Sequence, residues 1–269
     1  MKKIFEYIIL LFLFVFSLIY TNKIVDIIKS KDPIMKEIIK ESDSYKTQSI
    51  NATIVDNFII PGLNGCEIDI DSSYMNMKKI DNYNYMLLKY KDILPIISIN
   101  NIYDKYIVEG NIYKRNVSLV ININNDIQNL NEINNIKLNL FINSKLLENG
   151  KIDINKDFKI YNGGIYNETT IEWVNNLINK NYNKSNYCLL LEEDNDSLKI
   201  CKDKKMHTIL PKLIVTNNNT NKIKSEISNG SIIYFDENNI DQIYNIYNYV
   251  IKKGFKVVYL DELLSEDNC

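Results

Sequence analysis

Asn122 stands where a buried strand would end at a binding site. It follows the apolar, β-branched run Val117–Ile121 and precedes Ile123 and a polar stretch that reaches Asp126. An apolar run that ends in polar residues is typical of an α/β strand whose carboxyl end opens onto a functional site. The Asn122 amide can hold a hydroxyl group but cannot take a proton at neutral pH, and Ile123 cannot bind a metal. The segment therefore favours binding over acid–base or metal chemistry.

Other residues that often carry chemistry are few. His207 is the only histidine, and without a carboxylate partner it is interpreted as the start of a short strand rather than a general acid. The four cysteines contain no Cys-x-x-Cys pair, which argues against a zinc or redox motif. Cys188 and Cys201 flank a short segment and are predicted to form a disulfide outside the cytoplasm, the alternative being two unpaired buried cysteines. No metal and no other cofactor is expected.

The N-terminus predicts a membrane segment. Lys2 and Lys3 precede an apolar run from Tyr7 to Tyr20, which is the charge order of a secretory signal. Because no small-x-small cleavage site follows, residues 1–22 are predicted to be an uncleaved signal anchor, with the rest of the chain outside the cytoplasm. A cleaved signal peptide and a buried core helix are the alternatives. The net charge of −2 gives no polycation signal for nucleic acid.

The 269 residues are enough for one large domain and an extra segment. Residues 23–49 are predicted to be a stalk and linker, in which Asp32 caps a helix that begins at Pro33. Residues 50–112 are interpreted as a small accessory arm. Residues 113–266 alternate between strand and helix patterns, which favours a parallel sheet with crossover helices.

The predicted strands of this region are Val117–Ile123, Ile136–Ile142, Phe158–Tyr161, Tyr187–Leu191, Thr208–Leu210, Ser231–Phe235 and Phe255–Leu260. The predicted helices are Asn167–Asn181, Lys222–Ser228 and Asn239–Lys253, the last ending at Gly254.

Five phrases resemble the polysaccharide deacetylase family (carbohydrate esterase family 4). They are the strand that ends at Asn122, Leu138–Asn143, Lys159–Gly164, Asn229–Asp236 and Gly254–Leu264. The resemblance covers residues 113–266. It implies an α/β fold, a distorted and incompletely closed (β/α)7 barrel, behind the anchor and the arm. It also implies a carbohydrate N-deacetylase ancestry.

The motif residues of that family are missing. The two aspartates that the family uses as base and metal ligand fall on Asn122 and Ile123, and its two histidine ligands fall on Gly163 and Asn167. Its late histidine falls on Asp236. The family arginine has no counterpart either, because the chain's single arginine lies upstream of the first strand. The resemblance therefore implies neither catalytic nor metal residues here.

The same positions suggest a binding role. Asn122, Asn162, Asn167 and Asp236 could surround the family's site and hydrogen-bond sugar hydroxyls, and Trp173 could stack on a sugar face. In the alternative interpretation Trp173 packs its helix on the barrel, and the asparagines reflect an asparagine-rich chain.

Three functions stay open. The first is a membrane-anchored deacetylase-like protein that has lost catalysis and binds a cell-wall glycan. The second is an active deacetylase with displaced ligands, for instance Asp126, Asp236 and His207. The third is a surface interaction protein that uses the barrel as a scaffold and residues 50–112 as its contact region.

Overall fold

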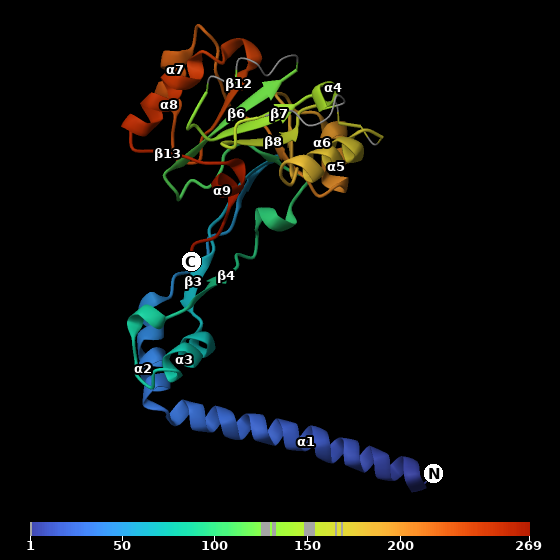
Figure 1. Cartoon of the computed structure of the whole chain (residues 1–269), viewed down its shortest axis with the longest axis vertical. Coiled ribbons are helices and arrows are strands. Elements are labelled where there is room, and N and C mark those ends of the chain that lie inside the picture. Colours follow the sequence, from blue (N-terminus) through green and yellow to red (C-terminus); the bar gives the residue numbers. More distant parts are fainter. Residues whose placement is uncertain (1, 125–129, 131–132, 148–153, 165, 168) are drawn as a thin grey trace. The chain divides into compact units, whose positions relative to one another are not determined.

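The chain divides into two compact units in its computed structural model. Unit 1 comprises residues 1–48, 65–93 and 268–269, and unit 2 comprises residues 49–64 and 94–267. The structure describes residues 2–124, 130, 133–147, 154–164, 166–167 and 169–269 (Figure 1). The segment 50–112, predicted as one arm, is split, because its middle belongs to unit 1 and its two ends belong to unit 2.

Unit 1 begins with a long apolar helix, α1 (Lys2–Lys31). Within the described residues, the stretch Tyr7–Lys31 of this helix is long and apolar enough to cross a membrane. The helix continues past the predicted anchor boundary at residue 22. Its apolar side chains from Tyr7 to Tyr20 are exposed in the chain itself, as an anchor or a signal sequence requires.

A small helical core follows in unit 1. Asp32 caps α2 (Pro33–Ser42) by accepting a hydrogen bond from the Ile34 N–H at 2.9 Å, so the predicted start of this helix is confirmed. The other elements are η1 (Asp43–Tyr45), β3 (Gly65–Ile68), α3 (Ile70–Lys78), η2 (Tyr85–Leu87) and β4 (Tyr90–Ile93). The apolar faces of α2 and α3 pack together through Ile38 and Met77, both fully buried.

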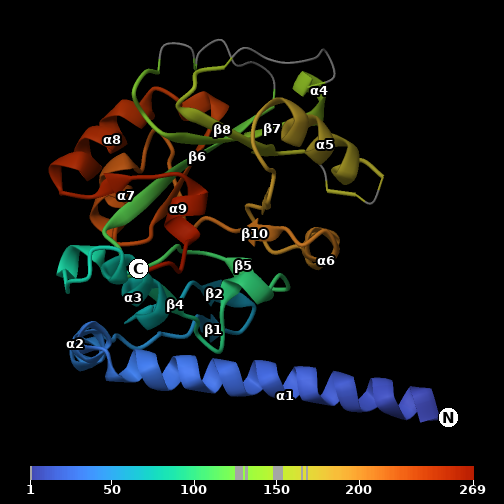
Figure 2. The ribbon, with the colours of Figure 1, turned by 60° about the horizontal axis from the view of Figure 1, so that its bottom comes forward.

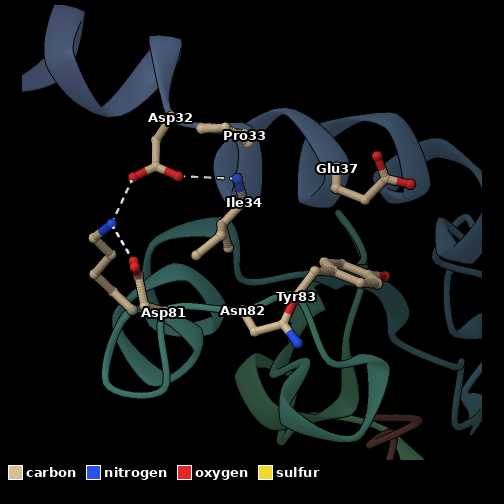
Figure 3. A pocket seen from close by; sticks show the side chains of 8 residues that line it. Asp32, Pro33, Ile34, Glu37, Asp81, Asn82 and Tyr83 are labelled. Carbon is tan, nitrogen blue, oxygen red and sulfur yellow. Dashed lines mark hydrogen bonds and ion pairs between the residues drawn. The ribbon is translucent and has the colours of Figure 1, made fainter.

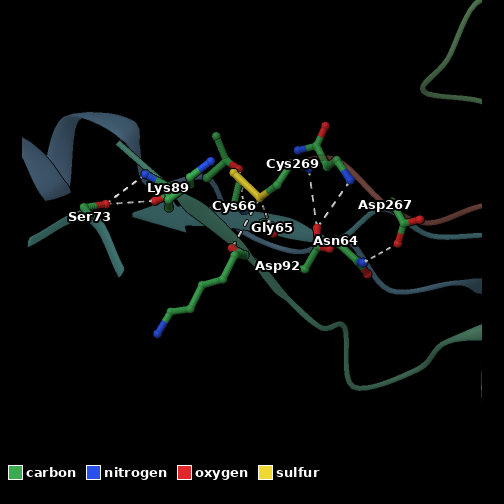
Figure 4. The surroundings of a disulfide bond; sticks show 11 residues. Asn64, Gly65, Cys66, Ser73, Lys89, Asp92, Asp267 and Cys269 are labelled. Carbon is green, nitrogen blue, oxygen red and sulfur yellow. Dashed lines mark hydrogen bonds between the residues drawn. A yellow bond between two sulfur atoms is a disulfide. The ribbon is translucent and has the colours of Figure 1, made fainter. Parts of the chain in front are cut away.

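Unit 1 also contains a disulfide that the sequence analysis did not assign. Cys66 on β3 is bonded to Cys269, the two residues being 203 positions apart (Figure 4). The strands β3 and β4 pair antiparallel beside it. The peptide N–H groups of Asn268 and Cys269 donate to the Asp92 carboxylate. The end of the chain is therefore fixed to this hairpin.

Unit 2 contains two sheets. The first has the order β11–β12–β6–β7–β8, and β13 also pairs with β6. Its strands are parallel: β6 (Asn116–Ile123), β7 (Leu138–Ile142), β8 (Phe158–Asn162), β11 (Leu213–Ile214), β12 (Ile232–Asp236) and β13 (Lys256–Val257). The second has the order β1–β2–β5–β10–β9: β1 (Thr53–Val55), β2 (Phe58–Ile60), β5 (Tyr106–Ile107), β9 (Tyr187–Leu189) and β10 (His207–Ile209).

Four helices of unit 2 cover one face of the first sheet, beside β6 and β8 (Figures 1 and 2). They are α4 (Ser144–Leu147), α5 (Ile171–Asn181), α7 (Thr220–Glu226) and α8 (Gln242–Lys252). Helix α6 (Asn195–Asp203) lies beside β10 of the second sheet. Short helices η3 (Ile99–Asn101), η5 (Glu237–Asn239) and α9 (Leu260–Leu264) complete the unit. Alternate strand residues divide the core: Ile121 faces the helices, whereas Val120 faces an inner core shared with the second sheet.

The α/β class and the open sheet are confirmed, because the strands form two sheets rather than one closed barrel. The prediction of a strand over Phe255–Leu260 is wrong beyond Val257. There Leu260, Leu263 and Leu264 form one turn of helix, whose apolar spacing buries all three against the inner core. Strand β5 and helix α6 were not predicted.

Candidate functional site

The carboxyl ends of β6 and β12 bring two of the predicted site residues together. Asn122 and Asp236 are direct neighbours in the register of these parallel strands. Both lie on the inner face, since Val120 and Tyr234, two residues earlier on each strand, belong to the inner core. In open parallel sheets this edge is where ligands bind. Asn122 and Asp236 therefore form the centre of the candidate site.

The carboxylate of Asp236 is occupied by its own chain. Its Oδ1 accepts the Asn238 N–H at 2.7 Å and the Asn239 Nδ2 at 2.8 Å, which caps the short helix η5. These two donors fix the carboxylate at the start of η5. Asp236 is thus poorly placed to act as the general acid that the deacetylase family has at this position.

Asn122 differs because its carbonyl oxygen has no partner. The Asn122 Oδ1 is buried and accepts no hydrogen bond within the described part of the chain. The Tyr234 hydroxyl lies beside this side chain: burial raises the Tyr234 pKa and Asp236 raises it further, while the Asn122 amide lowers it, giving about 12. Tyr234 is therefore neutral at pH 7, and the site offers hydrogen-bonding groups rather than a proton shuttle.

Aromatic rings fill the inner face next to these residues. Phe141 on β7 and Tyr161 on β8 are fully buried, with ring centroids 5.3 Å apart. Tyr187 on β9 meets Tyr161 edge to face at 5.1 Å. Burial raises the pKa of the Tyr161 hydroxyl well above its ordinary value, so this group stays protonated. These rings make the middle of the inner core apolar.

Gly163 stands where the resemblance to the deacetylase family places the first histidine ligand, and the neighbouring backbone leaves no room for a side chain there. A Cβ atom added at Gly163 would lie 2.4 Å from the Phe141 carbonyl carbon and 2.7 Å from the Ile142 nitrogen, both backbone atoms of β7. At the next residue, Gly164, the nearest atom would be 3.5 Å away. Because backbone atoms of a central strand cannot move aside cheaply, position 163 holds no side chain at all, and hence no imidazole ligand.

The other predicted site residues point elsewhere. The Asn162 side chain lies on the helix-covered face, where its Nδ2 donates to Asn175 and its Oδ1 accepts the Gly164 N–H at 3.1 Å. Asn167 Oδ1 accepts from the N–H groups of both Thr169 and Thr170, ahead of α5. The Asn162 and Asn167 amides form hydrogen bonds within the chain, so the structure separates these two residues from Asn122 and Asp236.

Trp173 lies on the outer side of α5 and is 46% exposed. The buried residues of that helix are Ile171, Val174 and Ile178, so Trp173 belongs neither to the core nor to the inner face. The alternative interpretation, in which Trp173 packs its helix against the sheet, does not match this exposure.

His207 lies at the amino end of its strand, whereas the candidate site lies at the carboxyl ends of β6 and β12. It is the first residue of β10 and stacks on Tyr103, at a centroid distance of 4.6 Å, and on Tyr187. Burial lowers the His207 pKa to about 4. It lines a cavity of about 200 Å³ together with Asp261 and Glu266. Lys159, in the first half of β8, donates to Asp261, which places this cavity at the amino ends of the strands.

A displaced metal site therefore lacks support in the described residues. His207 and Asp236 lie at opposite ends of their strands, and Asp126 falls outside the residues that the structure describes. No group of three or more His, Cys, Asp or Glu residues in the described part of the chain could hold a metal ion.

The amino-end cavity has a polar network that the sequence did not reveal. Glu266, only 2% exposed, accepts the Gly62 N–H at 2.8 Å and the Ile99 N–H at 3.3 Å. The Ser98 hydroxyl and the Asn100 amide also donate to it. Nothing in the sequence signals that a glutamate three residues from the C-terminus would be buried by segments some 170 positions away.

Unit 1 has a cavity of its own, of about 660 Å³ (Figure 3). Lys78 lines it and forms ion pairs with both Asp32, at 3.1 Å, and Asp81, at 2.7 Å. The Ile34 N–H and Lys78 lower the Asp32 pKa, and the two carboxylates raise the Lys78 pKa. The charges therefore satisfy one another at the start of α2, which indicates a structural role.

The Cys188–Cys201 disulfide that the spacing predicts is present, with a Cα–Cα distance of 6.4 Å. It joins β9 to α6 and lies in a small apolar cluster with Tyr166 and Met206. Together with Cys66–Cys269 it accounts for all four cysteines.

The chain is similar to known proteins in part of its sequence and in most of its fold. No family model matches the sequence. The protein YlxY of Bacillus subtilis (strain 168) is 30% identical over 100 residues, which is 37% of this chain and 31% of that one, so the match spans about a third of the relative.

Solved structures cover much more of the chain. The protein BA3943 of Bacillus anthracis, described as a CE4 family pseudoenzyme, is 20% identical, with a TM-score of 0.61 over 89% of this chain and 97% of that one. A mutant of it, described as a pseudoenzyme with restored enzymatic activity, matches with a TM-score of 0.61, 19% identity and coverage of 88% and 99%. The likeness thus extends beyond residues 113–266. The chain therefore has the fold of this CE4 family pseudoenzyme.

Proposed function

We propose that this protein is a catalytically inactive, membrane-anchored deacetylase-like protein that binds a cell-envelope glycan. The observation that carries the loss of catalysis is Gly163, where a Cβ atom would lie 2.4 Å from the backbone of β7. Substitution of a ligand in sequence can be compensated by a neighbour. A position with no room for a side chain cannot regain its ligand without moving a central strand.

The remaining parts of the family's mechanism are missing at the same edge. Metal-assisted amide hydrolysis needs a metal that activates water, a base beside that water and an acid for the leaving amine. Asn122 cannot act as the base. Ile123 is fully buried against the helices and offers no ligand atom. Asp236, at the late-histidine position, is engaged as the cap of η5.

Glycan binding is supported by a buried hydrogen-bond acceptor at the carboxyl ends of β6 and β12. Within the described residues the Asn122 Oδ1 is a buried acceptor without a donor, and a polar group in that state costs free energy unless a ligand satisfies it. A sugar hydroxyl is a suitable donor. The relative described as a pseudoenzyme with restored activity supports the idea that this fold can keep its binding edge while its chemistry is lost.

Placement outside the cytoplasm is supported by two independent features. α1 carries an apolar stretch long enough to span a bilayer, preceded by two lysines. Both pairs of cysteines are disulfide-bonded, and structural disulfides persist in oxidising compartments. Protease added to intact cells should digest unit 2, and complete protection before lysis would reject this orientation.

The catalytic and binding parts of the proposal can be tested together. The full-length protein in detergent should release no acetate from acetylated chito-oligosaccharides when zinc, cobalt or nickel is added, yet should bind them in calorimetry. The triple variant Asn122→Asp, Ile123→Asp, Gly163→His should stay inactive. Metal-dependent turnover that is lost in His207→Ala or Asp236→Ala would instead favour the active enzyme with displaced ligands. Absence of both turnover and binding would favour the interaction scaffold.

A further inference from the structure

A second polar cavity of unit 2 lies apart from the carboxyl ends of β6 and β12, where Asn122 and Asp236 are. It has a volume of about 310 Å³ and is lined by residues of α5, by residues just before β9 and by the turn after α6. Four of the lining residues are asparagines: Asn175, Asn176, Asn179 and Asn186.

Two of these asparagine side chains form hydrogen bonds that hold the cavity wall in place, and the other two form none within the described residues. Asn179 Oδ1 accepts the Ser185 N–H at 2.7 Å, and Asn175 Nδ2 donates to the Met206 sulfur at 3.0 Å. The side chains of Asn176 and Asn186 form no hydrogen bond within the residues that the structure describes. A rigid wall that presents free amides is preorganised for a ligand with many hydroxyl groups.

The cavity is also positively charged. Lys204 is paired with Glu172 at 2.8 Å. Lys184 and Lys205 line the same cavity, and among the described residues neither forms an ion pair. Three lysines against one glutamate leave an excess of positive charge in a chain whose net charge is −2. An anionic ligand would meet two cations that are not already neutralised.

Trp173 provides an aromatic surface beside the cavity. It is the only tryptophan of the chain and is 46% exposed. On α5 it directly follows Glu172 and lies one turn before Asn176, both of which line the cavity. A large aromatic ring that stays exposed next to polar groups is a common feature of ligand-contact surfaces.

We infer that this cavity binds an acidic saccharide, with its hydroxyls on Asn176 and Asn186, its carboxylates on Lys184 and Lys205, and one ring near Trp173. The site is separate from the Asn122 edge and does not depend on the function proposed there. It adds a selectivity for charge that the uncharged Asn122 amide cannot supply.

The test uses the full-length protein in detergent micelles with two trisaccharides, trigalacturonate and tri-N-acetylchitotriose. Trigalacturonate should bind in calorimetry and change the Trp173 fluorescence saturably. Lys184→Gln and Lys205→Gln should each weaken its binding by about fivefold or more, as should an increase in salt. Lys180→Gln removes the same charge from an exposed residue of α5 that does not line the cavity and should have no effect.

Three results would overturn the inference. One is the absence of saturable trigalacturonate binding. Another is an equal loss of affinity in Lys180→Gln, which would indicate attraction by net charge alone. The third is displacement of the trisaccharide by acetate at equal carboxylate concentration, which would indicate a simple anion site. Chitotriose binding that depends on Asn122 but not on the lysines reports on the other edge of the molecule, so the two proposals fail separately.

Discussion

The two ends of the parallel strands in unit 2 differ in whether the buried polar groups described below have hydrogen-bond partners. At the amino end, Glu266 accepts four hydrogen bonds while almost fully buried. The buried Asn139 amide there donates to Ser118 and accepts the Leu260 N–H. At the carboxyl end, the Asn122 Oδ1 has no partner within the described residues. In α/β folds with parallel strands, ligands bind at the carboxyl ends of the strands.

This difference is the one expected of the proposed function, in which the reaction is lost and the binding edge is kept. At the amino end the Glu266 carboxylate and the Asn139 amide are satisfied, which contributes to stability. The carboxyl end keeps an unsatisfied acceptor, which contributes nothing to stability on its own. If that acceptor served no purpose, an apolar side chain would be at least as stable there. The comparison can therefore be tested by changing one residue at each end.

The largest effect is expected at the carboxyl end, from a matched pair of adjacent glycines. Gly163→Ala should reduce the free energy of unfolding by at least about 3 kcal/mol, because its Cβ would overlap the β7 backbone. Gly164→Ala has 3.5 Å of clearance and should cost less than about 1 kcal/mol. Urea denaturation of unit 2 measures both. Equal stability of the two variants would show that position 163 can hold a side chain and would reopen the metal site.

Glu266→Ala should have the next largest effect, about 3 kcal/mol, because it leaves buried donors on Gly62, Ser98 and Ile99 without an acceptor. The control is Glu262→Ala, which removes an exposed carboxylate whose ion pair with Lys137 should contribute less than about 1 kcal/mol. A loss below 1 kcal/mol in Glu266→Ala would contradict the view that the amino end carries the stability of the unit.

The sequence predicted the elements of this fold better than its contacts. The helix expected at Asn239–Lys253 is α8, Gln242–Lys252, because its apolar residues follow the 3.6-residue period closely. The strand expected at Val117–Ile123 is β6, Asn116–Ile123. By contrast, the pairing of β5 with β10 joins segments about 100 residues apart, and no local pattern encodes which distant strand a short apolar segment will join.

The candidate site shows the same limit. The missing carboxylates at Asn122 and Ile123 followed from the resemblance of this strand to the opening strand of the deacetylase family. The burial of Asn162 against α5 and the contact of Gly163 with β7 depend on which face of a strand each residue takes and how closely the next strand approaches. A shift of one residue reverses the face. Asn162 and Asn167 were therefore placed in the site by alignment, whereas their hydrogen bonds lie within the chain.

His207 gives a pH test of the amino end. Its folded pKa of about 4 lies below the unfolded value of 6.5, so the unfolded chain binds more protons between these values. The contribution of neutral His207 is present in full above pH 6.5 and is lost as the pH falls towards 4. At pH 5 the loss should be about 2 kcal/mol. His207→Phe keeps an aromatic ring against Tyr103 and should flatten the dependence between pH 7 and 5; an unchanged slope would assign it to other groups.

The smallest expected effect is the most informative about function. Asn122→Leu replaces an unpaired buried acceptor by an apolar side chain next to the apolar inner core. Because no hydrogen bond to Oδ1 is lost, the free energy of unfolding should stay equal or rise by about 1 kcal/mol. Binding of chito-oligosaccharides should fall at least tenfold in the same variant. A gain in stability with a loss of binding is the signature of a residue kept for a ligand, whereas a loss of stability with unchanged binding would make Asn122 part of the scaffold, like the polar groups at the amino end.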